Sequence, residues 1–98
     1  MTRKEFETSF VEILIKNKIS HTVDFGSACD DYVASVADGL ELKISLRDLA
    51  VSVSVFNNRN HVSFMDVFYN EMSSLTFSDK SLFFGIEGKA TLMTVALA

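Results

Sequence analysis

The chain has 98 residues, of which 48% are apolar and 22% are charged, and its formal net charge is −4. This composition is typical of a globular domain and excludes an intrinsically disordered chain. Only nine basic residues are present, and direct nucleic-acid binding requires Lys and Arg to displace counterions from phosphates. We therefore predict a single domain over residues 1–98 that does not bind nucleic acid directly.

Cysteine usage and hydropathy indicate where the protein acts. Cys29 is the only cysteine, so no internal disulfide can form, and a reducing, cytoplasmic setting is the simple inference. No apolar run approaches the length of a membrane span, and Glu5, Glu7 and Glu12 stand where a signal peptide would carry no acidic residue. We expect no membrane association and a mature chain that begins at Met1.

The first predicted element is a helix over about residues 3–16. Thr2 and Glu5 have the spacing of a capping box, in which each side chain accepts a hydrogen bond from a backbone N–H at the start of the helix. The apolar side chains span an arc of about 200°, wider than the stripe of about 100° that one core contact needs. They are Phe6, Phe10, Val11, Ile13, Leu14 and Ile15. Either the sheet and the C-terminal segment cover both flanks of the helix, which we favour, or the excess forms a partner surface.

Residues 32–56 predict three consecutive antiparallel strands, preceded by a short edge strand within residues 19–25. Side chains alternate between the two faces of a strand, so the loop length decides which residues share a face. A short loop around residues 47–48 would pair Ile44 with Val51 and place every branched side chain of both strands on one face. The other face would be rich in serine and open to solvent or to a partner. Its predicted members are Val33, Ser35, Glu41, Lys43, Ser45, Ser52 and Ser54.

The turn between the first two of these strands contains Asp38-Gly39, which first suggests a two-residue hairpin loop. A three-residue loop over residues 37–39 is the better solution, because it places Tyr32 opposite Ile44 and keeps the large apolar residues together. Gly39 would then take the left-handed position of a type I turn with a G1 bulge, where a residue without Cβ avoids a steric cost. We therefore predict a positive φ at Gly39.

The segment over residues 62–75 has two interpretations. Ser63 and Asp66 repeat the capping spacing, and apolar residues then recur at steps of three and four, which favours a second helix over about residues 64–74. A strand is the competing interpretation, because β-branched and aromatic residues are frequent in the segment.

The C-terminal part predicts an antiparallel pair, residues 82–86 and 89–97, joined near Glu87-Gly88, with a helix over 89–98 as the alternative. The predicted fold is α+β, with an antiparallel sheet built on the meander of residues 32–56, packed against the N-terminal helix in the order α-β-β-β-α-β-β. This order is similar to that of the small secretion chaperones. The resemblance covers most of the chain and implies, as an alternative function, an acidic dimeric chaperone that holds an unfolded effector segment.

Five acidic residues lie between positions 24 and 41 with no Lys or Arg among them. They are Asp24, Asp30, Asp31, Asp38 and Glu41. We interpret them as a candidate partner-binding site, an acidic edge that would engage a basic protein surface. The ordinary alternative is that Asp38 serves the turn and the others face solvent, which is the more frequent situation for surface charges. A metal site at Asp30-Asp31 is disfavoured, because the pattern lacks further oxygen ligands at a defined spacing.

No catalytic or cofactor motif stands out in the sequence. His21 and His61 lie far apart and outside any zinc-binding pattern. Cys29 precedes two aspartates, whose charges would raise the pKa of its thiol and disfavour a nucleophile. We therefore expect no enzyme, no cofactor and no metal.

These patterns favour a non-catalytic protein that binds a partner protein with a basic surface and occludes it, for example a phage or mobile-element inhibitor of a host nucleic-acid machine. We also expect one edge strand without protecting proline or lysine, which would allow strand addition by a partner or a homodimer.

Overall fold

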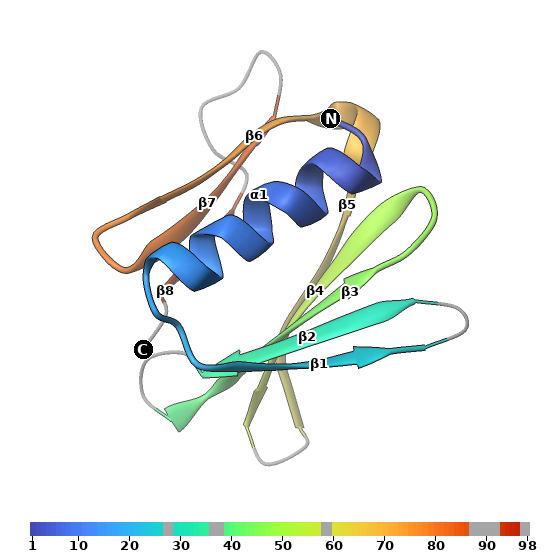
Figure 1. Ribbon diagram of the computed structural model, residues 1–98. Helices are drawn as coiled ribbons and strands as arrows, with labels where there is room; N and C mark the ends of the chain where they lie inside the picture. The colour runs from blue at the N-terminus through green and yellow to red at the C-terminus, as the bar shows by residue number, and fades with distance from the viewer. Residues whose placement is uncertain (27–28, 36–38, 58–59, 87–92, 97–98) are drawn as a thin grey trace.

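The computed structural model describes residues 1–26, 29–35, 39–57, 60–86 and 93–96. Within these residues the chain forms an α-helix followed by two antiparallel sheets, with a short 3-10 helix between the sheets (Figure 1). The fold is therefore α+β, as predicted. Helix α1 (Arg3–Lys16) lies across the sheets and covers the face that each turns toward it.

The first sheet is a five-stranded meander in which each strand pairs antiparallel with the next. Its strands are β1 (His21–Phe25), β2 (Asp30–Ser35), β3 (Glu41–Leu46), β4 (Ala50–Asn57) and β5 (Asn60–Phe68). The 3-10 helix η2 (Tyr69–Glu71) leads into a three-stranded sheet. That sheet consists of β6 (Met72–Ser78), β7 (Ser81–Ile86) and β8 (Met93–Ala96).

The predicted N-terminal helix and its cap are confirmed. The amide of Glu5 donates a hydrogen bond of 3.1 Å to Thr2 Oγ1, and the amide of Thr2 donates one of 2.8 Å to Glu5 Oε1. These two bonds satisfy backbone donors that a helix start otherwise leaves without an intrahelical partner. The N-terminal amine of Met1 also donates to the carbonyls of Tyr69 and Met72, at 2.9 and 2.6 Å. The start of α1 is thereby fixed to the connection between the two sheets.

Aromatic side chains join α1 to both sheets. The Phe6 ring lies 6.0 Å from that of Tyr69 and 6.3 Å from that of Phe84, measured between centroids. Phe10 meets Tyr32 edge to face at 5.5 Å, a geometry that adds to the free energy gained from burial alone. The helix thus contacts β7 of one sheet and β2 of the other, which supports the interpretation that both flanks are covered.

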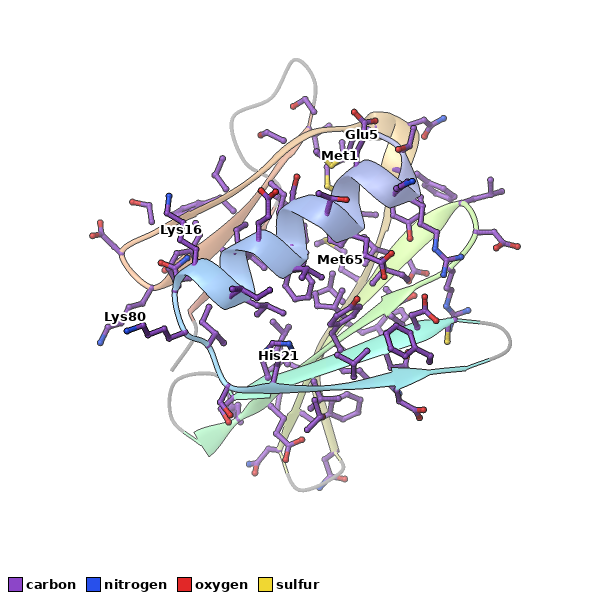
Figure 2. All side chains as sticks on the ribbon, viewed as in Figure 1. Met1, Glu5, Lys16, His21, Met65 and Lys80 are labelled. Carbon is purple, nitrogen blue, oxygen red and sulfur yellow. The ribbon has the colours of Figure 1, made fainter. Side chains whose placement is uncertain are left out.

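The core fills the space between the helix and the two sheets, as the side chains in Figure 2 show, with Met65 packed against it. Of the predicted apolar arc on α1, three residues are fully buried: Phe6, Phe10 and Leu14. Val11 and Ile13 are partly buried against the core. Only Ile15, which is 68% exposed, lies outside it.

The predicted register between the first two meander strands is confirmed. Tyr32 lies opposite Ile44 and Ser35 lies opposite Glu41, which is the register that a loop over residues 37–39 requires. Gly39 has the predicted positive φ, +74°. Positions 36–38, where the rest of this loop falls, lie outside the described residues.

The predicted register between β3 and β4 is wrong by two positions. Ile44 lies opposite Val53 and not Val51, and the turn is closed by a hydrogen bond of 3.0 Å from the Arg47 amide to the Ala50 carbonyl. A shift of two residues keeps every side chain on its original face, so the alternation of the sequence cannot detect it. Leu49 has the parity of the buried Val51 and Val53, but the shift places it at the tip of the turn and not on the strand.

The predicted second helix over residues 64–74 is wrong, so the order α-β-β-β-α-β-β is not the order of this fold. The end of β5, η2 and the start of β6 occupy this segment. β5 pairs with β4, with Val51 opposite Val67 and Val53 opposite Met65. The backbone edge of β4 needs a hydrogen-bonding partner, and tertiary pairing of this kind overrides local spacing. The apolar residues of this segment recur at steps of three and four because η2 interrupts two strands. The fold also does not reproduce the element order of the secretion chaperones.

The predicted C-terminal pair is confirmed for the described residues. Residues 93–96 form β8 and pair antiparallel with β7, with Leu82 opposite Val95, so the helical alternative is wrong there. The predicted connection near Glu87-Gly88 lies outside the described residues.

The serine-rich face of the meander is less open than predicted. Ser45, Ser52 and Ser54 are all buried. Longer side chains stand opposite them on neighbouring strands, with Lys43 across from Ser54 and Asp66 across from Ser52. Because a serine side chain is short, these neighbours shield it from solvent.

Candidate protein-contact surface

One end of the five-stranded sheet gathers segments that are distant in sequence. The antiparallel register places the end of β1, the start of β2, the β3–β4 turn and the end of β5 at the same end of the sheet, toward the right and the top of Figure 1. Three large apolar side chains are exposed there: Phe25 by 72%, Leu49 by 76% and Phe68 by 50%. Together with Arg47 and Asp48 we call them the sheet-end surface.

The β3–β4 turn stands between two hollows of this surface. One has a volume of about 500 Å³ and is lined by Met1, Thr2, Arg3, Asp48, Leu49, Phe68, Tyr69 and Asn70. The other has a volume of about 440 Å³ and is lined by Cys29, Arg47, Asp48, Leu49 and Ala50. Asp48 and Leu49 line both hollows, so the turn forms a ridge with a concave surface on either side.

Buried contacts hold the backbone of this turn in place. The hydroxyl of Tyr69 donates a hydrogen bond of 2.8 Å to the carbonyl of Arg47, and the amide of Tyr69 donates one of 3.1 Å to the carbonyl of Leu49. Burial of the phenol raises the pKa of Tyr69 to about 12, so the hydroxyl keeps its proton at neutral pH. The turn is therefore presented by a fixed support.

Arg3 links the helix start to β2 and to the β3–β4 turn. Its guanidinium lies 3.2 Å from the carboxylate of Asp30 and 3.4 Å from that of Asp48. Asp48 is almost fully exposed, and exposed pairs contribute little to stability. The arrangement nevertheless places one cation between two carboxylates beside the exposed Leu49.

The structure brings three of the five predicted acidic residues to this end of the sheet. Asp24 is exposed and lies opposite Asp31. Asp31 pairs with the ammonium group of Lys43 at 3.6 Å, and Asp30 pairs with Arg3. Two of the three carboxylates are therefore partly neutralised within the fold, and Asp24 has the most accessible charge.

The other two acidic residues do not join this group. Glu41 is exposed at the opposite end of the sheet, across from Ser35 and Phe56. Asp38 lies outside the described residues. The partner-binding role of all five stays a prediction.

Sequence reasoning missed the apolar part of this surface. Leu49 fits the alternation of the following strand, and only the true position of the turn reveals its exposure. Phe25 is the last residue of β1, and Phe68 is the last residue of β5, in the segment that was predicted as a second helix. The partners Arg3 and Lys43 lie far from the acidic residues in sequence.

The surroundings of Cys29 disfavour this thiol as a nucleophile. The Cys29 thiol donates to Asp31 Oδ1 at 3.4 Å, and this hydrogen bond raises the pKa of Cys29 above its ordinary value. A raised pKa lowers the fraction of reactive thiolate. Among the described residues, no group of three or more His, Cys, Asp or Glu side chains lies close enough to hold a metal ion.

Of the helices in the described part of the chain, none is long and apolar enough to cross a bilayer.

Comparison with known proteins adds no relative to these observations. The sequence matches no family model, and neither a curated protein nor a solved structure shows significant similarity to it. The functional interpretation therefore depends on the chemistry of the sheet-end surface.

Proposed function

We propose that the protein acts without catalysis, by binding a partner protein through the sheet-end surface and occluding part of that partner. The observation that carries the proposal is the exposure of Leu49. Its side chain is 76% exposed on a turn that Tyr69 holds and that two hollows flank. A rigidly presented apolar side chain binds with less loss of conformational entropy than a mobile one.

The exposure of single apolar residues is normal for soluble proteins and needs no explanation. Here Leu49 of the β3–β4 turn and Phe68 of β5 line the same hollow, and Phe25 of β1 is exposed at the same end of the sheet. Exposed apolar groups that gather in this way, with charged groups around them, are typical of protein-interaction sites. This arrangement favours a protein-binding site over apolar residues that are exposed without a role.

The charged groups indicate the chemistry of the partner. Asp24 and Asp48 are exposed at or beside the surface, and the chain carries a formal charge of −4. A partner with an apolar patch bordered by Lys or Arg would be complementary to it, and long-range attraction would speed the encounter. A nucleic-acid machine that is blocked at a basic surface is one example, and the free thiol of Cys29 supports a cytoplasmic setting.

The alternative, a dimeric chaperone similar to the secretion chaperones, depended on the order of elements. β5 and β6 stand where that resemblance requires a helix. The element order therefore gives this alternative no support.

Capture from a lysate of the producing cells, with mass spectrometry of the retained proteins, tests the proposal. The immobilised baits are the natural chain, a Leu49→Lys variant and an Ile15→Lys control, which carries the same change at an exposed apolar residue of α1. We expect a protein that the natural chain and the control retain and that Leu49→Lys loses. Equal retention by all three baits contradicts the proposed surface.

A further inference from the structure

The outer face of β5 carries two exposed aromatic rings with a carboxylate between them. Side chains along a strand alternate between the two faces of the sheet. Val67 is buried and Met65 is partly buried against the core, so these two residues face α1. The residues Phe64, Asp66 and Phe68 therefore project from the opposite face. Phe64 is exposed by 56% and Phe68 by 50%, and Asp66 is exposed as well.

Small neighbours on β4 explain this exposure. The residues opposite the three side chains are Ser54, Ser52 and Ala50, and their side chains are too short to cover a phenyl ring. On the other side of β5, no strand of the described residues pairs with it. A side chain of another molecule can therefore approach the rings and the carboxylate from the outer face.

One oxygen of the Asp66 carboxylate is engaged within the fold, and the other is not. The hydroxyl of Ser52 donates a hydrogen bond of 2.6 Å to Asp66 Oδ1, which orients the carboxylate on the sheet. Among the described residues, no cation forms an ion pair with it. Lys43, a cation on the same face of the sheet, pairs with Asp31 at 3.6 Å. The charge of Asp66 is therefore not neutralised, and its Oδ2 can accept from a donor outside the chain.

We propose that Phe64, Asp66 and Phe68 bind an arginine side chain of the partner protein. The role of this site rests on the proposed function, since the arginine belongs to the basic surface of the partner. Side chains two residues apart on one face of a strand are separated by about 7 Å, and a cation is attracted to an aromatic face within about 6 Å of the ring centre. A guanidinium can thus donate from its edge to the carboxylate and lie with its flat face on a phenyl ring.

Charge and position favour this occupant over an apolar side chain or a lysine. An apolar side chain would bury the Asp66 carboxylate without a partner, which is costly, whereas an arginine neutralises it. A lysine has a compact and strongly hydrated charge that does not stack on a ring in the same way. Phe68 also lines a hollow of the sheet-end surface together with Leu49. A partner that covers Leu49 can therefore reach the outer face of β5 without a break in the contact.

Titration of the natural chain with a small arginine probe tests the site without the partner. The probe is N-acetyl-arginine amide, and nuclear magnetic resonance follows the backbone amides at constant ionic strength. We expect saturable shifts at residues 64–68, weaker binding of N-acetyl-lysine amide, and no binding of the citrulline derivative, which has a similar shape without the charge. The absence of a saturable shift at these residues overturns the proposal, and so does equal binding of the lysine or citrulline derivative.

Variants of the site keep the fold and remove one interaction at a time. Asp66→Asn removes the charge but keeps an acceptor for the Ser52 hydroxyl, and it should raise the dissociation constant of the arginine probe by about threefold or more. The double variant Phe64→Leu/Phe68→Leu keeps apolar side chains without the rings and should weaken binding as well. Unchanged binding by either variant overturns the proposal.

Asp79→Asn is the matched control for the loss of charge. Asp79 is an exposed carboxylate of the β6–β7 turn, and asparagine tolerates its positive φ of 50°. This variant should bind the arginine probe as the natural chain does. An equal loss of binding in Asp79→Asn and Asp66→Asn would assign the effect to net charge and overturn the site.

Calorimetry with the captured partner separates failure of this site from failure of the proposed function. Asp66→Asn should bind the partner more weakly than the natural chain and Asp79→Asn do. If Asp66→Asn binds normally while Leu49→Lys does not, the arginine site is wrong and the sheet-end surface stands. If Leu49→Lys binds normally while Asp66→Asn does not, the arginine site stands and the sheet-end surface is not the contact.

Discussion

Tyr69 holds the backbone of the turn on which Arg47 lies. Its hydroxyl donates a hydrogen bond of 2.8 Å to the Arg47 carbonyl, and its amide binds the carbonyl of Leu49. Tyr69 itself is buried against Phe6 of α1. The exposed position of Leu49 is therefore determined by packing in the interior.

Replacing Tyr69 with Phe should loosen the turn without removing apolar contact. The Arg47 carbonyl loses its donor, so we expect the free energy of unfolding to fall by about 1–2 kcal/mol. Partner binding should weaken as well. Chemical denaturation and a binding titration measure the two effects.

Tyr32→Phe is the matched control for this change. Tyr32 donates a hydrogen bond of 2.9 Å to Glu7 Oε2, away from the β3–β4 turn, so its loss should affect stability but leave partner binding unchanged. If both variants affected binding equally, the turn would have no special role.

The two tyrosines of the chain should titrate at high pH. Burial raises the pKa of Tyr32 and of Tyr69 to about 12, against an ordinary value of about 10. Because the folded state holds these protons more tightly, the resulting stability is present below pH of about 10 and is lost as the pH rises toward about 12.

Tyrosinate absorbance measures this directly, since both chromophores are buried. The midpoint should lie well above that of the chain in denaturant, and unfolding should become easier over the same pH range. A folded-state midpoint equal to that of the denatured chain contradicts the burial of both phenols.

Gly39→Ala should destabilise the fold by about 1 kcal/mol, the cost of a left-handed backbone for a residue with Cβ. Gly39 has φ of +74°, and a Cβ there would meet no atom within 4 Å. The cost is therefore one of backbone conformation alone. Gly39→Asn should cost less, because asparagine tolerates this region. Equal stability of all three proteins, measured by denaturant unfolding, would argue against this geometry.

Reversing Asp24 to Lys should weaken partner binding and reduce its dependence on salt. Asp24 is the most accessible of the three carboxylates near the sheet-end surface, whereas Asp30 and Asp31 are engaged by Arg3 and Lys43. Reversal of either of those two would also disturb the fold. Binding measured at several salt concentrations checks this, and an unchanged affinity and salt slope would remove the acidic edge from the account.

The sequence allowed prediction of those elements in which independent signals agree. For α1, the capping pair Thr2 and Glu5 and the helical period of the apolar residues indicate the same segment. For the β2–β3 pair, strand parity and the conformational freedom of Gly39 select the same register. Agreement between local and global preference is typical of foldable sequences.

The remaining features could not be predicted because the local pattern is compatible with more than one structure. A slip of two residues preserves strand parity, so the position of Leu49 in the turn was hidden. The spacing from Met65 to Met72 suits a helix until the need of β4 for a partner strand is considered. The ion pairs of Asp30 and Asp31 come from residues brought close only by folding, so the sequence overstated the free charge of the acidic edge.

Isothermal titration calorimetry of the captured partner against the natural chain and Leu49→Lys tests the central claim most directly. We predict that Leu49→Lys binds roughly tenfold or more weakly, a loss of about 1.4 kcal/mol or more, while Ile15→Lys keeps the natural affinity and the folded spectrum is unchanged in both. If Leu49→Lys binds the partner as tightly as the natural chain does, the sheet-end surface is not the contact site and the account is contradicted.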